Sequence, residues 1–173
     1  MMRFHVPTLP LAAMLLLAAA PLAAQSVALK PGADVAFYGI TFLDTSTEGA
    51  YFGAREDEQA RIRLLEEEVR ARFGEEGLVL LDLAPVAEEL GRIANPADCY
   101  GCEIRMGKKL GADYVLVGEV QKVSNLILSM NLVLRDVETG AMARGMSVDI
   151  RSNTDDSWLR GIRYILKNNV FGE

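Results

Sequence analysis

The stretch that decides the fold runs from residue 113 to residue 151 and reads DYVLVGEVQKVSNLILSMNLVLRDVETGAMARGMSVDIR. Residues 113–120 form a nearly continuous apolar run, which is typical of a strand covered on both faces. Residues 126–135 then alternate, with Leu126, Leu128, Met130, Leu132 and Leu134 on one face. Residues 141–151 alternate in the same way, and the turn DVETG lies between the two segments. This pattern predicts an antiparallel hairpin that follows a buried strand and has one solvated face.

Upstream of this stretch, apolar runs at residues 33–42 and 78–83 predict two further strands. Residues 55–73 predict a helix, because Ile62, Leu65, Val69 and Phe73 recur at spacings of three and four. Shorter helices are expected at residues 85–93 and 103–110, the second ending at Gly111.

Downstream of the hairpin, residues 155–170 predict a last helix with Thr154 as its N-cap. Its buried stripe is expected to consist of Trp158, Ile162, Ile165 and Leu166. The element order is therefore β-α-β-α-α-β-β-β-α. We expect residues 25–173 to form a single α/β domain, a sandwich of helices on a mixed five-stranded sheet.

The first 24 residues have the order of a secretory signal peptide: Arg3, then an apolar run from Leu11 to Leu22, then small residues. The run is too short to span a bilayer, because Pro21 ends it. Residue 24 is the working boundary, although cleavage after Ser26 or Ala28 would place small residues at both the −3 and the −1 position. Because no cysteine stands at the cleavage site to accept a lipid, we expect a periplasmic protein without a membrane anchor.

Composition and charge exclude several classes of function. The net charge of −6 argues against nucleic-acid binding, which depends on a basic surface. Cleavage removes His5, the only histidine, so the mature chain cannot use Ser-His-Asp or Cys-His catalysis. Gly-rich phosphate loops are absent from the sequence. We therefore expect no catalytic residues and no cofactor.

Cys99-Tyr100-Gly101-Cys102 is the one motif whose side chains suggest a chemical role. A structural disulfide that ties the loop to the following helix is the preferred interpretation, in keeping with an oxidising periplasm. A redox-active pair is the second interpretation, since a helix N-terminus favours thiolate. A Cu(I) site made of both cysteines and Met106 is the third.

Residues 43–54 are expected to form a long loop, and such loops often carry recognition. Asp44, Tyr51 and Phe52 are its candidate interaction residues. A mobile connection is the alternative. The acidic pair Asp155 and Asp156 is explained by the first turn of a helix rather than by catalysis.

Several motifs in residues 99–164 resemble a family of secreted proteobacterial proteins classified only as a domain of unknown function. They are CYGC, LGAD at 110–113, Gly118, KVSN at 122–125, Arg135-Asp136, Thr139-Gly140 and the run from Asn153 to Trp158. That family offers no activity to carry over.

The pattern GADYVLVGEV, an alternating strand and RDVETG is also similar, more distantly, to the N-terminal domain of TolB and to the envelope modules CsgG and FlgO. The resemblance implies a TolB N-terminal-like fold and a domain that docks other envelope proteins. We therefore expect a non-catalytic periplasmic module that binds a periplasmic or outer-membrane protein or a small ligand. The alternative is a thiol-disulfide or Cu(I)-handling protein that uses Cys99 and Cys102.

Overall fold

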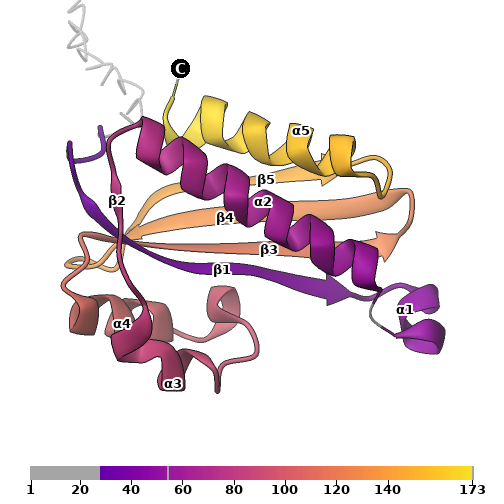
Figure 1. The fold of residues 1–173 in the computed structure, drawn as a ribbon, viewed down its shortest axis with the longest axis horizontal. Coiled ribbons are helices and arrows are strands. Elements are labelled where there is room, and N and C mark those ends of the chain that lie inside the picture. Colours follow the sequence, from indigo (N-terminus) through magenta and orange to yellow (C-terminus); the bar gives the residue numbers. More distant parts are fainter. Residues whose placement is uncertain (1–27, 54, 173) are drawn as a thin grey trace, which may run out of the picture.

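The computed structural model describes residues 28–53 and 55–172 (Figure 1). The predicted signal peptide, residues 1–24, lies outside the described residues. The strands are β1 (Asp34–Asp44), β2 (Val79–Leu80), β3 (Tyr114–Ser124), β4 (Ile127–Asp136) and β5 (Met142–Ile150). The helices are α1 (Thr47–Phe52), α2 (Glu56–Glu75), α3 (Ala87–Leu90), α4 (Cys102–Leu110) and α5 (Asp155–Ile165). Short 3₁₀ turns cover Ala84–Val86 and Pro96–Asp98, and a π-helical turn, Leu166–Val170, extends α5.

The five strands form one mixed sheet in the order β2-β1-β3-β4-β5. β1 pairs in parallel with β2 and β3, whereas β3, β4 and β5 form an antiparallel meander. This arrangement confirms the predicted α/β class, the mixed five-stranded sheet and the hairpin.

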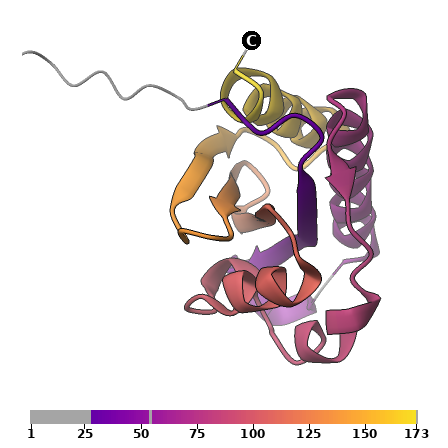
Figure 2. The same ribbon diagram turned by 90° about the vertical axis from the view of Figure 1, so that its left-hand side faces the viewer.

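The long helices α2 and α5 cover one face of the sheet, and α3 and α4 lie under one end of the other face (Figures 1 and 2). On α2, the predicted stripe Ile62, Leu65, Val69 and Phe73 is buried in the larger core. α5 begins at the predicted cap, where Thr154 Oγ1 accepts a hydrogen bond from Ser157 N. Its apolar side chains join the same core.

Strand β4 presents Leu128, Met130, Leu132 and Leu134 to that core, as its alternation predicts. Leu126 differs from the prediction, because it precedes β4 and its side chain is 71% exposed. It lies in the turn between β3 and β4, where the pleat that orients the other leucines has not begun.

Two other expectations need correction. The described part of the predicted loop, residues 43–53, is largely regular structure, because β1 continues to Asp44 and α1 follows. Ser46 caps α1 by accepting a hydrogen bond from Gly49 N, a start signal that the loop prediction overlooked. The strand predicted at residues 78–83 pairs only at Val79 and Leu80, since Asp82 turns the chain by accepting a hydrogen bond from Ala84 N.

A bulge in β1 places α2 on the sheet. The pairing of β1 with β3 slips between Phe37 and Ile40, and Gly39 takes a φ of +86°. Glu66 on α2 accepts a hydrogen bond at 2.9 Å from the backbone N of Ile40, the first residue after the bulge. Helix α2 thus supplies a hydrogen-bond acceptor for the β1 backbone where the pairing with β3 is interrupted.

Close packing of α4 on the sheet generates the first prediction. A Cβ at Gly107 would lie 2.5 Å from Val115 Cγ1 and 3.0 Å from Val137 Cγ2. We expect Gly107→Ala to lower the free energy of unfolding by about 1–3 kcal/mol, because the added methyl group would overpack the interface between α4 and the sheet. Urea denaturation measures the change. Gly74→Ala is the matched control, because its Cβ would meet no atom within 4 Å and a helical alanine is favourable. Equal stability of the two variants would contradict this account of the packing.

Candidate functional site

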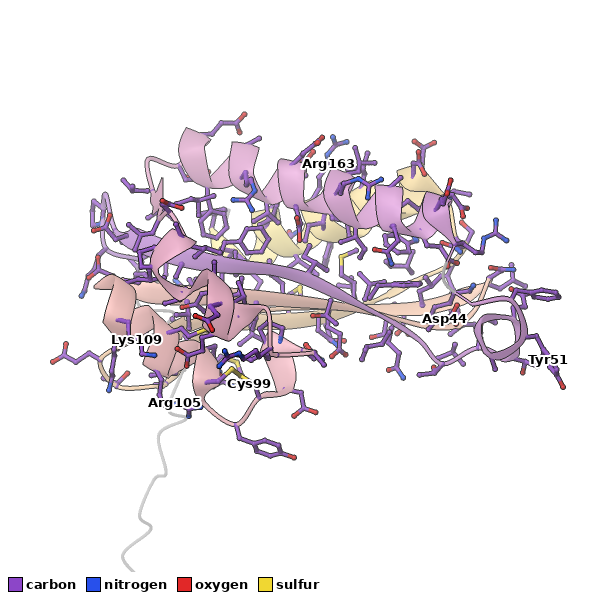
Figure 3. The ribbon with its side chains drawn as sticks, turned by 60° about the horizontal axis from the view of Figure 1, so that its bottom comes forward. Asp44, Tyr51, Cys99, Arg105, Lys109 and Arg163 are labelled. Carbon is purple, nitrogen blue, oxygen red and sulfur yellow. A yellow bond between two sulfur atoms is a disulfide. The ribbon has the colours of Figure 1, made fainter. Side chains whose placement is uncertain are left out.

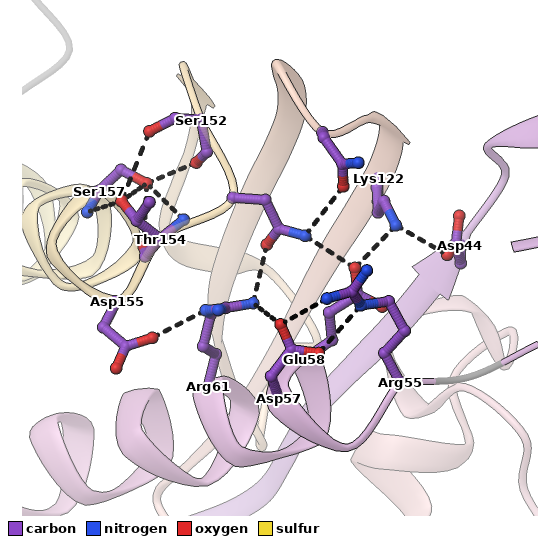
Figure 4. A network of polar contacts seen from close by, with 12 residues as sticks. Asp44, Arg55, Asp57, Glu58, Arg61, Lys122, Ser152, Thr154, Asp155 and Ser157 are labelled. Carbon is purple, nitrogen blue, oxygen red and sulfur yellow. Dashed lines mark hydrogen bonds and ion pairs between the residues drawn. The ribbon is translucent and has the colours of Figure 1, made fainter. Parts of the chain in front are cut away.

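A fully buried lysine organises the end of the sheet that carries α1 (Figure 4). Lys122 Nζ lies 2.7 Å from Glu58 Oε1 on α2 and 3.2 Å from Asp44 Oδ2 at the end of β1. Glu48 Oε2 on α1 lies 3.8 Å from the same nitrogen. Three carboxylates from residues 44–58 therefore converge on one ammonium group that is distant from them in sequence. We call the side chains of Asp44, Glu58, Lys122, Asn125 and Asn153 the polar network.

The charged forms of Lys122 and Asp44 are both stabilised by neighbouring groups. Burial alone would lower the pKa of the Lys122 ammonium, but hydrogen bonds to Glu58 and Asp44 outweigh it and raise that pKa. Burial likewise opposes ionisation of Asp44, yet hydrogen bonds from Ser46 and from Lys122 outweigh it and lower the pKa of Asp44. Lys122 and Asp44 are therefore both charged at neutral pH.

Two asparagines extend the network to the β3–β4 turn and to the start of α5. Asn153 Nδ2 donates to Glu58 Oε1 at 2.7 Å and to Asn125 Oδ1 at 3.4 Å. Asn125 Nδ2 donates to Glu48 Oε2 at 2.5 Å. Arg61 closes the side facing α5, because it donates to Asn153 Oδ1 and to Asp155 Oδ1. Asp155, which the sequence explains by the first turn of α5, therefore also contacts α2 through its ion pair with Arg61.

The polar network holds α1 without an apolar core beneath it. α1 has no buried residue, and its Tyr51 and Phe52 side chains are 80% and 83% exposed. Ser46 links the helix to the network, since its Oγ donates to Asp44 Oδ1 and accepts from Gly49 N. Figure 3 shows Tyr51 pointing outward at the end of the molecule. We call residues 44–52 the tip.

A small cavity of about 240 Å³ lies against the tip. Lys122, Asp44 and Glu48 line its polar side, and Phe52 lines it from α1. The tip therefore combines an apolar aromatic pair with a charged floor.

The structure brings the predicted interaction residues Asp44, Tyr51 and Phe52 into this one region. Asp44 is part of the buried support, whereas Tyr51 and Phe52 are exposed. Sequence analysis placed Lys122 and Asn153 among the motifs of the family resemblance without giving them a role, and it did not single out Glu58. A further signal was present: Lys122 shares the core-facing side of β3 with Val120, a position where an unpaired charge is unfavourable.

Cys99 and Cys102 are joined in a disulfide with a Cα–Cα distance of 5.5 Å (Figure 3). Cys102 and Met106 lie on one side of α4, buried in the smaller core beneath the sheet. The third possible metal-ligand group beside the two sulfurs is the carboxylate of Glu103, whose Oε2 lies 3.1 Å from Cys99 Sγ. Between the cysteines, Tyr100 has a φ of 54° and an exposed side chain.

The polar network generates the second prediction. Lys122→Met leaves Glu58 buried without its cation, so we expect the free energy of unfolding to fall by about 3–5 kcal/mol. The double variant Lys122→Met with Glu58→Met should recover most of that loss, because the fully buried carboxylate is removed together with its cation and Asp44 keeps its hydrogen bonds from Ser46. A double-mutant cycle in urea measures the coupling. Lys109→Met, at an exposed ion pair with Glu89, serves as control and should change stability by less than about 1 kcal/mol. Simple additivity of the two core substitutions would contradict the assignment.

No described helix has the length and apolar character needed to cross a bilayer. A search of curated protein sequences gave no match. Among solved structures, the C-terminal domain of LpoB from Salmonella enterica matches with a TM-score of 0.52 and 15% identity, covering 72% of this chain and 86% of that one. This likeness shows a shared fold.

Two further structures show weaker likeness. The lipoprotein GNA1162 from Neisseria meningitidis matches with a TM-score of 0.48 and 18% identity, covering 71% of this chain and 83% of that one. TolB from Acinetobacter baumannii matches with a TM-score of 0.43 and 12% identity, covering 82% of this chain and 30% of that one.

The family comparison covers almost all of the domain. The model of the family DUF3280, described as "Protein of unknown function (DUF2380)", matches residues 33–170. This range contains the whole sheet, both cysteines and the polar network. The chain therefore belongs to this family of proteins of unknown function.

Proposed function

We propose that the exported protein is a non-catalytic periplasmic module that docks another envelope protein through its tip. The observation that carries this proposal is the exposure of Tyr51 and Phe52 on a helix that a buried polar network holds in place. The predicted signal peptide and the resemblance to envelope docking modules support the compartment and the class of partner.

The aromatic pair has the properties of a binding anchor. Aromatic side chains dominate the energetics of many protein interfaces, because a rigid ring buries a large apolar area at low cost in conformational entropy. Adjacent aromatic residues on a six-residue helix without buried residues contribute little to the core of this domain. Their free energy of burial is therefore available to a partner.

The network supplies the preorganisation that such an anchor needs. A fixed tip loses less entropy on binding than a mobile loop does. Buried ion pairs give little net stability compared with apolar packing, so the presence of Lys122 and Glu58 here is better explained by positioning. The matching partner surface is an apolar pocket that accepts both rings and has polar groups around it to meet Glu48 and Arg55.

Crosslinking in intact cells tests this docking function. A photoreactive amino acid at position 51 should capture one defined envelope protein, and the same residue at position 63, exposed on α2, should not. With the purified pair, we expect Tyr51→Ala with Phe52→Ala to weaken binding by at least about tenfold, because two anchors are lost. Tyr100→Ala removes an exposed tyrosine next to Cys99, which Figure 3 shows well away from Tyr51, and should leave the affinity unchanged. Unchanged affinity of the Tyr51/Phe52 variant would refute docking through the tip.

A thiol-disulfide or Cu(I)-handling function is the second candidate, and it rests on the accessibility of Cys99. Cys99 is only partly buried, whereas Cys102 is buried, so Cys99 is the more accessible residue of the pair. The carboxylate of Glu103 beside Cys99 Sγ disfavours a thiolate there. That contact is the reason for preferring docking.

Replacing both cysteines separates the two candidates. If the disulfide only ties the loop to α4, Cys99→Ser with Cys102→Ser should lower the free energy of unfolding by about 2 kcal/mol and leave partner binding unchanged. The pair should also titrate below about −300 mV in a dithiothreitol series. A potential between about −120 and −270 mV, together with a cellular defect of the double variant, would favour the redox function.

A further inference from the structure

Strand β5 is a free edge of the sheet, and β3 and β4 separate it from β1, the strand that leads into the tip. It pairs with β4 on one side, and Figure 2 shows it at the outer margin of the curved sheet. In an edge strand, alternate residues direct their N–H and C=O groups away from the neighbouring strand. Among the described residues, the backbone of residues 145–150 makes hydrogen bonds only within this pairing. The edge is therefore open to another strand.

A groove of about 390 Å³ runs along this edge between β5 and α5. Its floor is the end of β5, and α5 contributes Arg160, Gly161 and Tyr164. Gly161 brings the helix close to the strand, since a Cβ there would lie 3.3 Å from Ile150 Cγ1. A chain added to β5 would thus run beside the helix, within reach of its side chains.

The charges in the groove indicate the chemistry of the added chain. Arg151 and Arg160 line it, and neither guanidinium forms an ion pair or hydrogen bond with any described residue. By contrast, Arg61 and Arg163 are both paired with carboxylates. Two unpaired guanidinium groups in an acidic protein provide a local positive potential that attracts carboxylates.

Asp149 is the one acid among the residues that line the groove. The two arginines outnumber it, so the lining as a whole keeps a positive character. A second copy of β5 would bring only this one acid, so it matches the groove poorly.

We infer that β5 accepts an extended acidic segment of a partner polypeptide as an additional strand, with its carboxylates on Arg151 and Arg160. This inference rests on the proposed docking function and deepens it by naming the second contact surface and the chemistry of the segment. Main-chain hydrogen bonds to the free edge supply affinity, and the two guanidinium groups select acidic side chains. The exposed ring of Tyr164 flanks the same groove and offers apolar contact.

Two synthetic peptides with blocked ends test the inference, one of alternating Glu and Thr and one of alternating Lys and Thr. Titrated into the ¹⁵N-labelled exported protein, the Glu peptide should shift the amide resonances of β5 and α5. We expect it to bind about tenfold more tightly than the Lys peptide, because two ion pairs replace two repulsions. Arg151→Glu with Arg160→Glu should reverse that preference. Arg63→Glu, an exposed position on α2, is the matched control and should keep it.

Three results would overturn the inference: no shift of β5 resonances with the Glu peptide, equal affinity for the two peptides, or a concentration-dependent dimer that pairs through β5. The Tyr51→Ala and Phe52→Ala variant should still bind the Glu peptide. If the Glu peptide does not bind while crosslinking at position 51 still captures the envelope protein, only the edge site is rejected. Loss of capture at position 51 rejects docking through the tip, whichever way the peptides behave.

Discussion

The contact between the buried ammonium of Lys122 and the carboxylates of Glu58 and Asp44 is the constraint on which the end of this molecule depends. It joins β3 to the first turn of α2 and to the last residue of β1. A charge in such a place is tolerated only when its partners satisfy it, because the low dielectric makes an unpaired ion expensive. The amide of Asn153 also donates to Glu58 Oε1, and the amide of Asn125 donates to Glu48 on α1.

The molecule divides its stabilisation between two kinds of contact. Apolar packing of α2 and α5 on the sheet, and of α4 beneath it, provides the cores. The tip depends instead on ion pairs and on the Ser46 cap, which fix geometry more than they add stability. This division explains how α1 can present Tyr51 and Phe52 to solvent and still occupy a defined position.

The two proposed contact surfaces differ in position and in chemistry. The tip offers aromatic rings above a charged floor, and the β5 edge offers backbone groups beside two unpaired guanidinium groups. One suits a pocket in a folded partner, and the other suits an extended acidic segment. The likeness to the LpoB domain concerns the fold, so the functional argument rests on the side chains of this chain.

The sequence by itself determined the elements whose signal is local. Helix α2 follows from its three- and four-residue spacing, the hairpin from alternation, and α5 from its Thr154 cap. Local patterns did not predict α1, because a six-residue helix without an apolar stripe has no periodicity to detect. Only the tertiary structure decided the polar network, since its bonds join residues 64 and 95 positions apart. The same holds for the edge groove, because only sheet order and helix packing bring Arg151 and Arg160 into one lining.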